Sequence, residues 1–113
     1  MHELGVTENI VNIALDKAKE AQASKIVNIN LVIGELSGFV PDCIQFYFNS
    51  LIKDTIAEGA TLNFKSAPAQ FRCRDCSTIF CLQNTLWSCP KCQSHSLEIA
   101  AGRDLYVESM EVE

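Results

Sequence analysis

Apolar residues recur at helical spacing near the start of the chain. The stripe consists of Val6, Ile10, Ile13, Ala14, Ala18 and Ala21. Steps of three and four residues predict an amphipathic helix, which we place at about residues 5–22. Gly5 or Thr7 marks its expected start. Lys17 and Lys19 in its last turns suit the negative end of the helix dipole.

Strict alternation replaces this pattern between Lys25 and Ile33. Val27, Ile29, Leu31 and Ile33 fall on one side of the segment, and Asn28 and Asn30 fall on the other. A period of two predicts a strand with one buried face. Gly34 and Gly38 then bracket a predicted loop.

Pro41 begins a second region of helical periodicity. The apolar positions are Ile44, Tyr47, Phe48, Leu51 and Ile52. Proline is well tolerated in the first turn of a helix, and we expect this helix to stop at Gly59. Two further strands are predicted, at 61–66 and 105–112, and the alternation of the second is too imperfect to fix its facing.

Between these last two strands lie two Cys-x-x-Cys knuckles, Cys73–Cys76 and Cys89–Cys92, separated by twelve residues. Two knuckles at this distance can surround one ion with four thiolates, which is the closed arrangement of structural zinc. Thiolates also accept iron, and ordinary core or disulfide cysteines are the alternative to a metal site. We interpret the segment as a zinc-ribbon lobe that needs its metal in order to fold.

The predicted architecture is α+β. About three strands form one sheet with two helices on one face, and the zinc-ribbon lobe is inserted before the last strand. Residues 1–67 and 104–113 would form one domain, and residues 68–103 a zinc-binding domain. No internal repeat appears beyond the doubled knuckle.

Three further residues could carry chemistry. We expect Cys43 to pack in the second helix as a small hydrophobe. Cys81 is interpreted as a buried thiol outside the ligand set, with exchange against a zinc ligand left open. His95 is interpreted as a surface residue of the lobe.

Met1, His2 and Glu3 bring an α-amine, backbone amides and an imidazole together. Such nitrogen donors suit square-planar Ni(II) or Cu(II), although a solvated terminus fits the same residues. Glu3 and Glu35 could add carboxylates or lie in solvent. We expect Met1 to be retained, because His2 is bulky.

Composition narrows the class of protein. The chain has 113 residues, 48% of them hydrophobic, and a net charge of −5, which argues against a general nucleic-acid binder. Residues 65–103 are locally basic, with five Lys or Arg and two Asp or Glu.

No secretory pattern and no apolar run of ~20 residues is seen, so we expect a cytoplasmic protein without a membrane span. No catalytic constellation is found, and we predict that the chain is not an enzyme.

Several segments together form a specific combination: Met1-His2-Glu3, residues 33–38, Val40-Pro41, residues 46–48, residues 58–60 with Leu62, both knuckles and residues 102–113. In these segments the chain resembles the HypA/HybF family of hydrogenase nickel-incorporation proteins. One departure is Gln93, which stands where a glycine often follows the second knuckle and leaves the local turn in doubt.

The resemblance implies a cytoplasmic nickel metallochaperone. It implies nickel at Met1, His2 and Glu3, delivered to the large-subunit precursor of [NiFe] hydrogenase together with the accessory GTPase HypB. Some relatives also serve urease maturation. No nucleic-acid partner is expected, and a homodimer is left open. The alternatives are a zinc-ribbon nucleic-acid-binding module and a small iron–thiolate electron-transfer protein.

Overall fold

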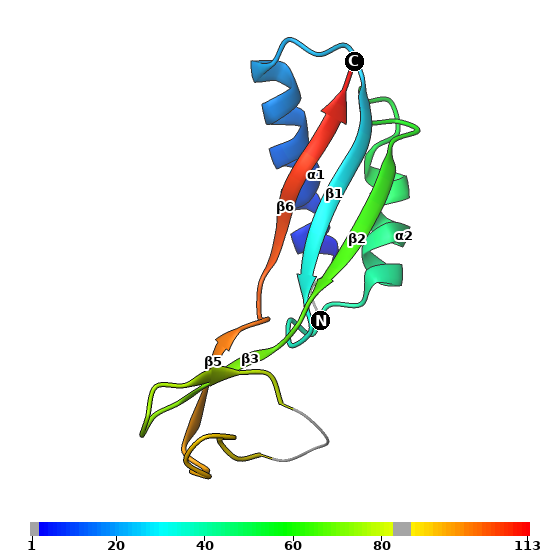
Figure 1. The fold of residues 1–113 in the computed structure, drawn as a ribbon. Coiled ribbons are helices and arrows are strands. Elements are labelled where there is room, and N and C mark those ends of the chain that lie inside the picture. The colour runs from blue at the N-terminus through cyan, green and yellow to red at the C-terminus, as the bar shows by residue number, and fades with distance from the viewer. Residues whose placement is uncertain (1–2, 83–86) are drawn as a thin grey trace.

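The structure is a computed structural model that describes residues 3–82 and 87–113. It is elongated, 55 × 26 × 19 Å along its principal axes, with two sheets at its two ends (Figure 1). The first sheet has the strand order β2-β1-β6, from Thr61–Ala67, Ile26–Gly34 and Leu105–Val112. The predicted α+β class, with two helices beside a three-stranded sheet, is confirmed.

Strand pairing in the first sheet follows from the connections. β1 and β2 are parallel, so a crossover must join them, and helix α2 (Pro41–Leu51) supplies it. β6 runs antiparallel to β1, with a register shift where Asn30 faces Ser109 and Leu31 faces Val107. The extra residue of this bulge changes which face the following side chains occupy, and this explains the imperfect alternation of residues 105–112.

Helix α1 spans Glu3–Glu20, about two residues earlier than the periodicity suggests. Gly5 and Thr7 therefore lie inside the helix, and Thr7 is buried, with its Oγ1 donating to the carbonyl of Glu3. The predicted stripe is wrong at two positions, because Ile13 and Ala21 are exposed. Val11 is buried instead, one helical turn below Thr7.

Helix α2 buries Ile44, Phe48 and the capping residue Ile52, as its periodicity predicts. It ends at Leu51, so the expected stop at Gly59 is wrong. Two features end it early: Asp54 adopts a left-handed φ of 63°, and Thr55 Oγ1 donates to the carbonyl of Ile52. Cys43 is exposed on this helix and does not pack as a core hydrophobe.

Both helices cover the same face of the first sheet (Figure 1). The core between them contains α1, α2 and sheet residues; its fully buried large side chains include Ile26, Ile29, Leu31, Ile44 and Phe48. The opposite face is polar. There Asn63 donates to Asn30, and Asn30 donates to Ser109, at 2.9 and 3.0 Å, so one chain of hydrogen bonds crosses all three strands.

Residues 68–103, the metal lobe, form the second sheet. Its strand order is β4-β3-β5, from Ile79–Phe80, Gln70–Cys73 and Leu97–Ala101. These three short strands were not predicted. The division of the chain into domains at 67/68 and 103/104 stays a prediction about independent folding.

Two glycines allow a close approach of backbone segments where the metal lobe meets the lobe that contains the first sheet and its two helices. Gly34 donates to the carbonyl of Asp104 at 2.7 Å, and Leu36 donates to that of Gly102, also at 2.7 Å. A Cβ on Gly34 would lie 2.3 Å from the Gly102 oxygen. Gly102 itself has φ +100°, and a Cβ there would lie 2.7 Å from the Cα of Ala69. Only glycine fits both positions.

Candidate metal centres

The two knuckles are similar hairpins. In the first, the amide of Cys73 donates to Thr78 and the amide of Ser77 donates to Cys73, both at 2.9 Å. In the second, Cys89 donates to Ser94 at 2.8 Å and Gln93 donates to Cys89 at 2.9 Å. Ser77 and Gln93 both adopt left-handed φ angles, 63° and 61°. Gln93 therefore takes the backbone conformation that favours glycine, and the turn is kept despite the departure from the family pattern.

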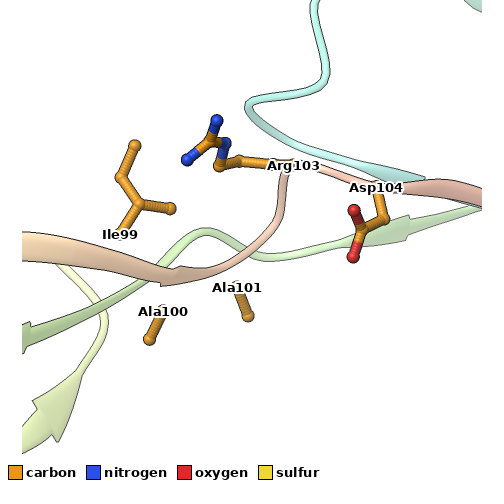
Figure 2. A pocket seen from close by; sticks show the side chains of 5 residues that line it. All are labelled: Ile99, Ala100, Ala101, Arg103 and Asp104. Carbon is orange, nitrogen blue, oxygen red and sulfur yellow. The ribbon is translucent and has the colours of Figure 1, made fainter.

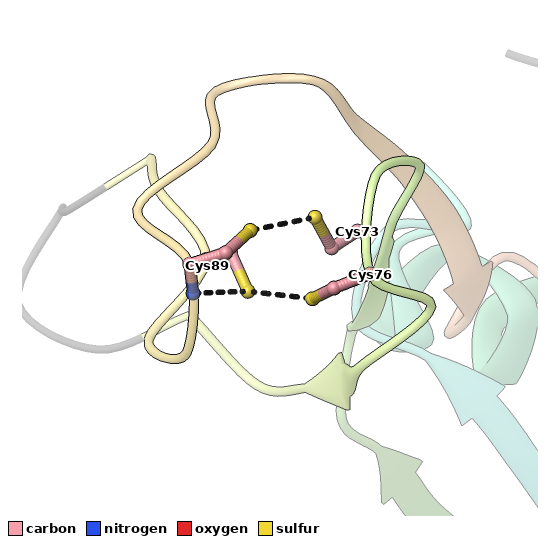
Figure 3. Close-up of side chains that lie close together, drawn as sticks. Cys73, Cys76 and Cys89 are labelled. Atoms are coloured by element: carbon pink, nitrogen blue, oxygen red, sulfur yellow. Dashed lines mark hydrogen bonds between the residues drawn. The ribbon is translucent and has the colours of Figure 1, made fainter.

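These hairpins bring the four predicted ligands together. The sulfurs of Cys73, Cys76, Cys89 and Cys92 all lie within 4.8 Å of one another. Two pairs of sulfurs across the knuckles are 3.5 Å apart: Cys73 with Cys92, and Cys76 with Cys89. Figure 3 shows the second pair. A Zn–S distance of ~2.3 Å in a tetrahedron places sulfurs about 3.8 Å apart. The cluster therefore fits one tetrahedral thiolate-bound ion.

Hydrogen bonds give the thiols unequal acidity. Thr78 lowers the pKa of Cys76 to about 6, because its hydroxyl, 3.1 Å from the sulfur, and its backbone amide stabilise a thiolate. The amide of Ser94 lowers the pKa of Cys92, but the sulfur of Cys73, loss of solvent and the other two sulfurs together raise it to about 12. A divalent ion bound by the four sulfurs would remove this inequality, since coordinated thiols are deprotonated outright.

Contacts between the knuckles also hold the cluster. The amide of Arg74 donates to the carbonyl of Ser96 at 2.9 Å, and the hydroxyl of Ser94 donates to the carboxylate of Asp75. The amide of Lys91 points at the sulfur of Cys89 at 3.4 Å. Thr78, Asp75 and Ser94 were missed at the sequence level, because polar residues beside cysteines carry no distinctive spacing.

Cys81 and His95 lie outside the four-sulfur cluster. Cys81 is exposed, so the expectation of a buried thiol is wrong. His95 is exposed, as predicted, and its Nδ1 donates to the carbonyl of Trp87 at 3.0 Å. Within residues 3–82 and 87–113, the four sulfurs form the only group of three or more potential metal ligands.

Glu3 is the one predicted nickel-site residue that the structure describes. Met1 and His2 lie outside the described residues. Glu3 is 8% exposed, and its Oε2 accepts a hydrogen bond from the amide of Val40 at 3.2 Å, so the alternative of a solvated glutamate is wrong. Glu35 is exposed, and its Oε1 accepts from the amide of Ala69 at 3.4 Å.

In the described part of the chain, no helix has the length and apolar character that a bilayer crossing requires.

Comparisons with known proteins find the same family along the full chain. The profile of the family described as "Hydrogenase/urease nickel incorporation, metallochaperone, hypA" matches residues 1–112. The hydrogenase maturation factor HypA of Dehalococcoides mccartyi is 47% identical over 113 residues, covering 100% of this chain and 95% of the relative. That of Caldanaerobacter subterraneus subsp. tengcongensis is 40% identical over 114 residues, covering 100% of both.

Solved structures show the same fold. The solution structure of the Ni metallochaperone HypA from Helicobacter pylori matches with a TM-score of 0.73 at 25% identity, over 99% of this chain and 97% of that one. A second, a solution structure of HypA protein, matches with a TM-score of 0.81 at 26% identity, over 100% and 97%. The chain belongs to the HypA family of hydrogenase and urease nickel-incorporation metallochaperones.

Proposed function

We propose that this chain binds Ni(II) at its N-terminus and delivers it to the large-subunit precursor of [NiFe] hydrogenase, together with the accessory GTPase HypB. The observation that carries the proposal is the donor set of Met1, His2 and Glu3 in a chain that matches the nickel-incorporation family from residue 1. An α-amine, amide nitrogens and an imidazole supply the four in-plane donors that square-planar Ni(II) takes.

The buried position of Glu3 supports this proposal. Its carboxylate is held by the amide of Val40, and its carbonyl accepts from Thr7. The backbone that would supply nickel-binding amides is therefore fixed from its third residue onward. Nickel is the cargo, and its release to the precursor would require that ligands of the recipient replace the donors of Met1, His2 and Glu3 on the ion.

We further propose that Cys73, Cys76, Cys89 and Cys92 hold a structural Zn²⁺. Four thiolates leave no open coordination position, so the ion would stabilise the lobe and catalyse nothing. In this proposal the chain works in the cytoplasm and has no catalytic activity of its own; the GTPase hydrolyses the nucleotide. Urease maturation proteins are further proposed partners.

Nickel titration of three untagged proteins tests the N-terminal site. They are the wild type, His2→Ala, and a chain with one residue added before Met1. We expect both variants to keep fold and zinc content and to lose tight nickel binding, because one removes the imidazole and the other converts the amine into an amide. Nickel affinity should also fall as pH drops below neutral, since binding expels protons. Wild-type affinity in the extended chain would exclude the α-amine as a ligand.

Delivery needs a separate measurement. Radioactive nickel bound to the chain should move to the purified large-subunit precursor faster in the presence of the GTPase and GTP than in their absence. His2→Ala is the matched control, since it should leave the partner-binding surfaces unchanged. Equal transfer from free nickel and from the loaded chain would refute delivery while leaving nickel binding intact.

A further inference from the structure

Strand β5 is an edge strand of the metal-lobe sheet. It pairs with β3 on one side, and among the described residues no strand pairs with its other side. The register shifts where Phe71 faces Ile99 and Gln70 faces Ala101, so Ala100 is the extra residue of a bulge. The outer edge therefore presents backbone groups that can accept another strand.

Residues of β5 line two hollows, which share Ile99. One has a volume of about 320 Å³. It is lined by Leu36, Phe71, Trp87, His95, Leu97 and Ile99. The other has a volume of about 400 Å³ and is lined by residues 99–101, Arg103 and Asp104. Together they follow the strand from Leu97 to the end of the lobe.

The first hollow is apolar and open. Phe71 forms its buried floor and packs edge-on against Trp87, with ring centroids 5.8 Å apart. Trp87 is 62% exposed, and Leu36 and Ile99 are 42% and 43% exposed. Large apolar side chains gathered around a concavity are typical of a binding site for an apolar side chain.

The second hollow carries a cation. Figure 2 shows the guanidinium of Arg103 on the same side of the ribbon as the Ile99 side chain, with Ala100 and Ala101 on the opposite side. The carboxylate of Asp104 points away from Arg103 (Figure 2). Within residues 3–82 and 87–113, Arg103 forms no salt bridge, whereas Arg72 in the same lobe is paired with Glu98 at 2.7 Å.

We propose that the outer edge of β5 binds an extended acidic segment of another protein. The segment would pair its main chain with Leu97–Ala101, place an apolar side chain against Phe71 and Trp87, and place a carboxylate on Arg103. β5 has five residues, so a matching segment is about five to seven residues long. This function of the lobe is additional to nickel delivery and does not depend on it.

The distribution of charge favours an acidic peptide over a nucleic acid as the ligand of this edge. A polyanion needs several cations along its backbone, but among the described residues that line the two hollows Arg103 is the one Lys or Arg, and it is accompanied by the carboxylate of Asp104. The metal lobe as a whole has four basic and two acidic residues in a chain of net charge −5. An acidic peptide is therefore attracted to this lobe, while a second copy of this acidic chain is repelled overall.

The test is peptide selection on the full-length, zinc-loaded chain. A displayed library of random twelve-residue peptides is enriched on the wild type and counter-selected on Ile99→Lys. Affinities of the selected peptides for the wild type and variants are then measured by fluorescence polarisation. We expect acidic peptides with alternating apolar residues, and binding weakened about tenfold or more by Ile99→Lys and about fivefold by Arg103→Glu. Amide shifts in ¹⁵N-labelled protein should concentrate at 97–101.

Matched controls lie elsewhere on the molecule. Ile79 is exposed on β4, the opposite edge of the same sheet, so Ile79→Lys adds the same side chain to the other edge. Lys53→Glu makes the same charge change as Arg103→Glu in the exposed turn after α2. Both should bind as the wild type does. Zinc content of every variant separates lost docking from lost folding.

Four outcomes would overturn the proposal. The first is no enrichment over the Ile99→Lys protein. The second is an equal loss of affinity with Ile79→Lys. The third is tighter, salt-dependent binding of a twelve-nucleotide single strand that Arg103→Glu abolishes and Ile99→Lys leaves unchanged. The fourth is concentration-dependent dimerisation, by light scattering, that Ile99→Lys abolishes, which would assign the edge to a second copy.

Discussion

Replacing Gly34 with alanine tests how firmly the two lobes are joined. The new Cβ would lie 2.3 Å from the oxygen and 2.4 Å from the carbon of Gly102, and 3.0 Å from the nitrogen of Arg103. All three are backbone atoms, so no side-chain rotation relieves the contact. Since carbon atoms pack at ~3.5–4.0 Å, the two segments must separate by about 1 Å or more.

That separation acts on two hydrogen bonds at the junction. Gly34 to Asp104 and Leu36 to Gly102 are both 2.7 Å long, and an added ångström takes them beyond hydrogen-bond distance. Each contributes ~0.5–1.5 kcal/mol, and overpacking itself costs ~1–3 kcal/mol. We therefore expect Gly34→Ala to lower the free energy of unfolding by about 2–6 kcal/mol.

Urea denaturation followed by circular dichroism measures this change. With a slope of ~2 kcal/mol per molar, the midpoint should fall by about 1–3 M. Gly5→Ala and Gly59→Ala are controls, because a Cβ at either position meets nothing within 4 Å. Gly5 lies in helix α1, so its replacement should stabilise by ~0.5–1 kcal/mol. Gly59 has φ +83°, so its replacement should cost ~1–2 kcal/mol through backbone strain alone. A Gly34→Ala protein within ~0.5 kcal/mol of the wild type would refute tight packing at the junction.

Cys76→Ser should release zinc and unfold the metal lobe while the first sheet persists, because the free energy of metal binding stabilises the folded form of such a lobe. Metal analysis together with two-dimensional NMR would show this. Full zinc occupancy in the variant would contradict it. Gln93→Gly should raise lobe stability by ~1 kcal/mol by relieving the left-handed φ of 61°, measured as resistance of zinc to a chelator. Thr78→Val should raise the pH at which zinc is lost. Removing the hydroxyl raises the pKa of the Cys76 thiol, so protons compete with zinc for this sulfur at a higher pH. A chromogenic zinc indicator followed from pH 7 to 4 would detect the shift. Phe48→Ala should lower the free energy of unfolding by ~3–5 kcal/mol, since Phe48 is fully buried, and calorimetry would measure it.

The first sheet and its helices were predictable because their burial is periodic. Leu31 and Phe48 sit at positions whose spacing alone indicates a buried face. The errors have local causes that periodicity does not contain. Helix α2 ends before Gly59 because Asp54 and Thr55 form an alternative turn, and the facing of β6 changes at a bulge.

The strands of the metal lobe were not predictable in the same way. β3 and β4 have four and two residues, too few for alternation to register. β3 ends at Cys73, which belongs to the metal cluster and begins the knuckle turn, so the residues there do not follow a strand pattern. The cysteine spacing nevertheless predicted which sulfurs meet, because a knuckle fixes the geometry of its two ligands locally.

The hydrogen bond between Glu3 and Val40 could not be predicted from the sequence. Glu3 and Val40 are 37 residues apart, and no local pattern predicts that a carboxylate in the first turn of α1 accepts the amide at the start of α2. Val40 belongs to the segment that follows β1, and the same segment contains Leu36, which donates to Gly102, and Glu35, which accepts from Ala69. Hydrogen bonds from Glu3 and from both ends of the metal lobe, Ala69 and Gly102, therefore meet on one segment, residues 35–40. No local pattern brings these partners to one segment; the packing of the fold does, and Gly34 and Gly102 allow the close approach of the backbones there.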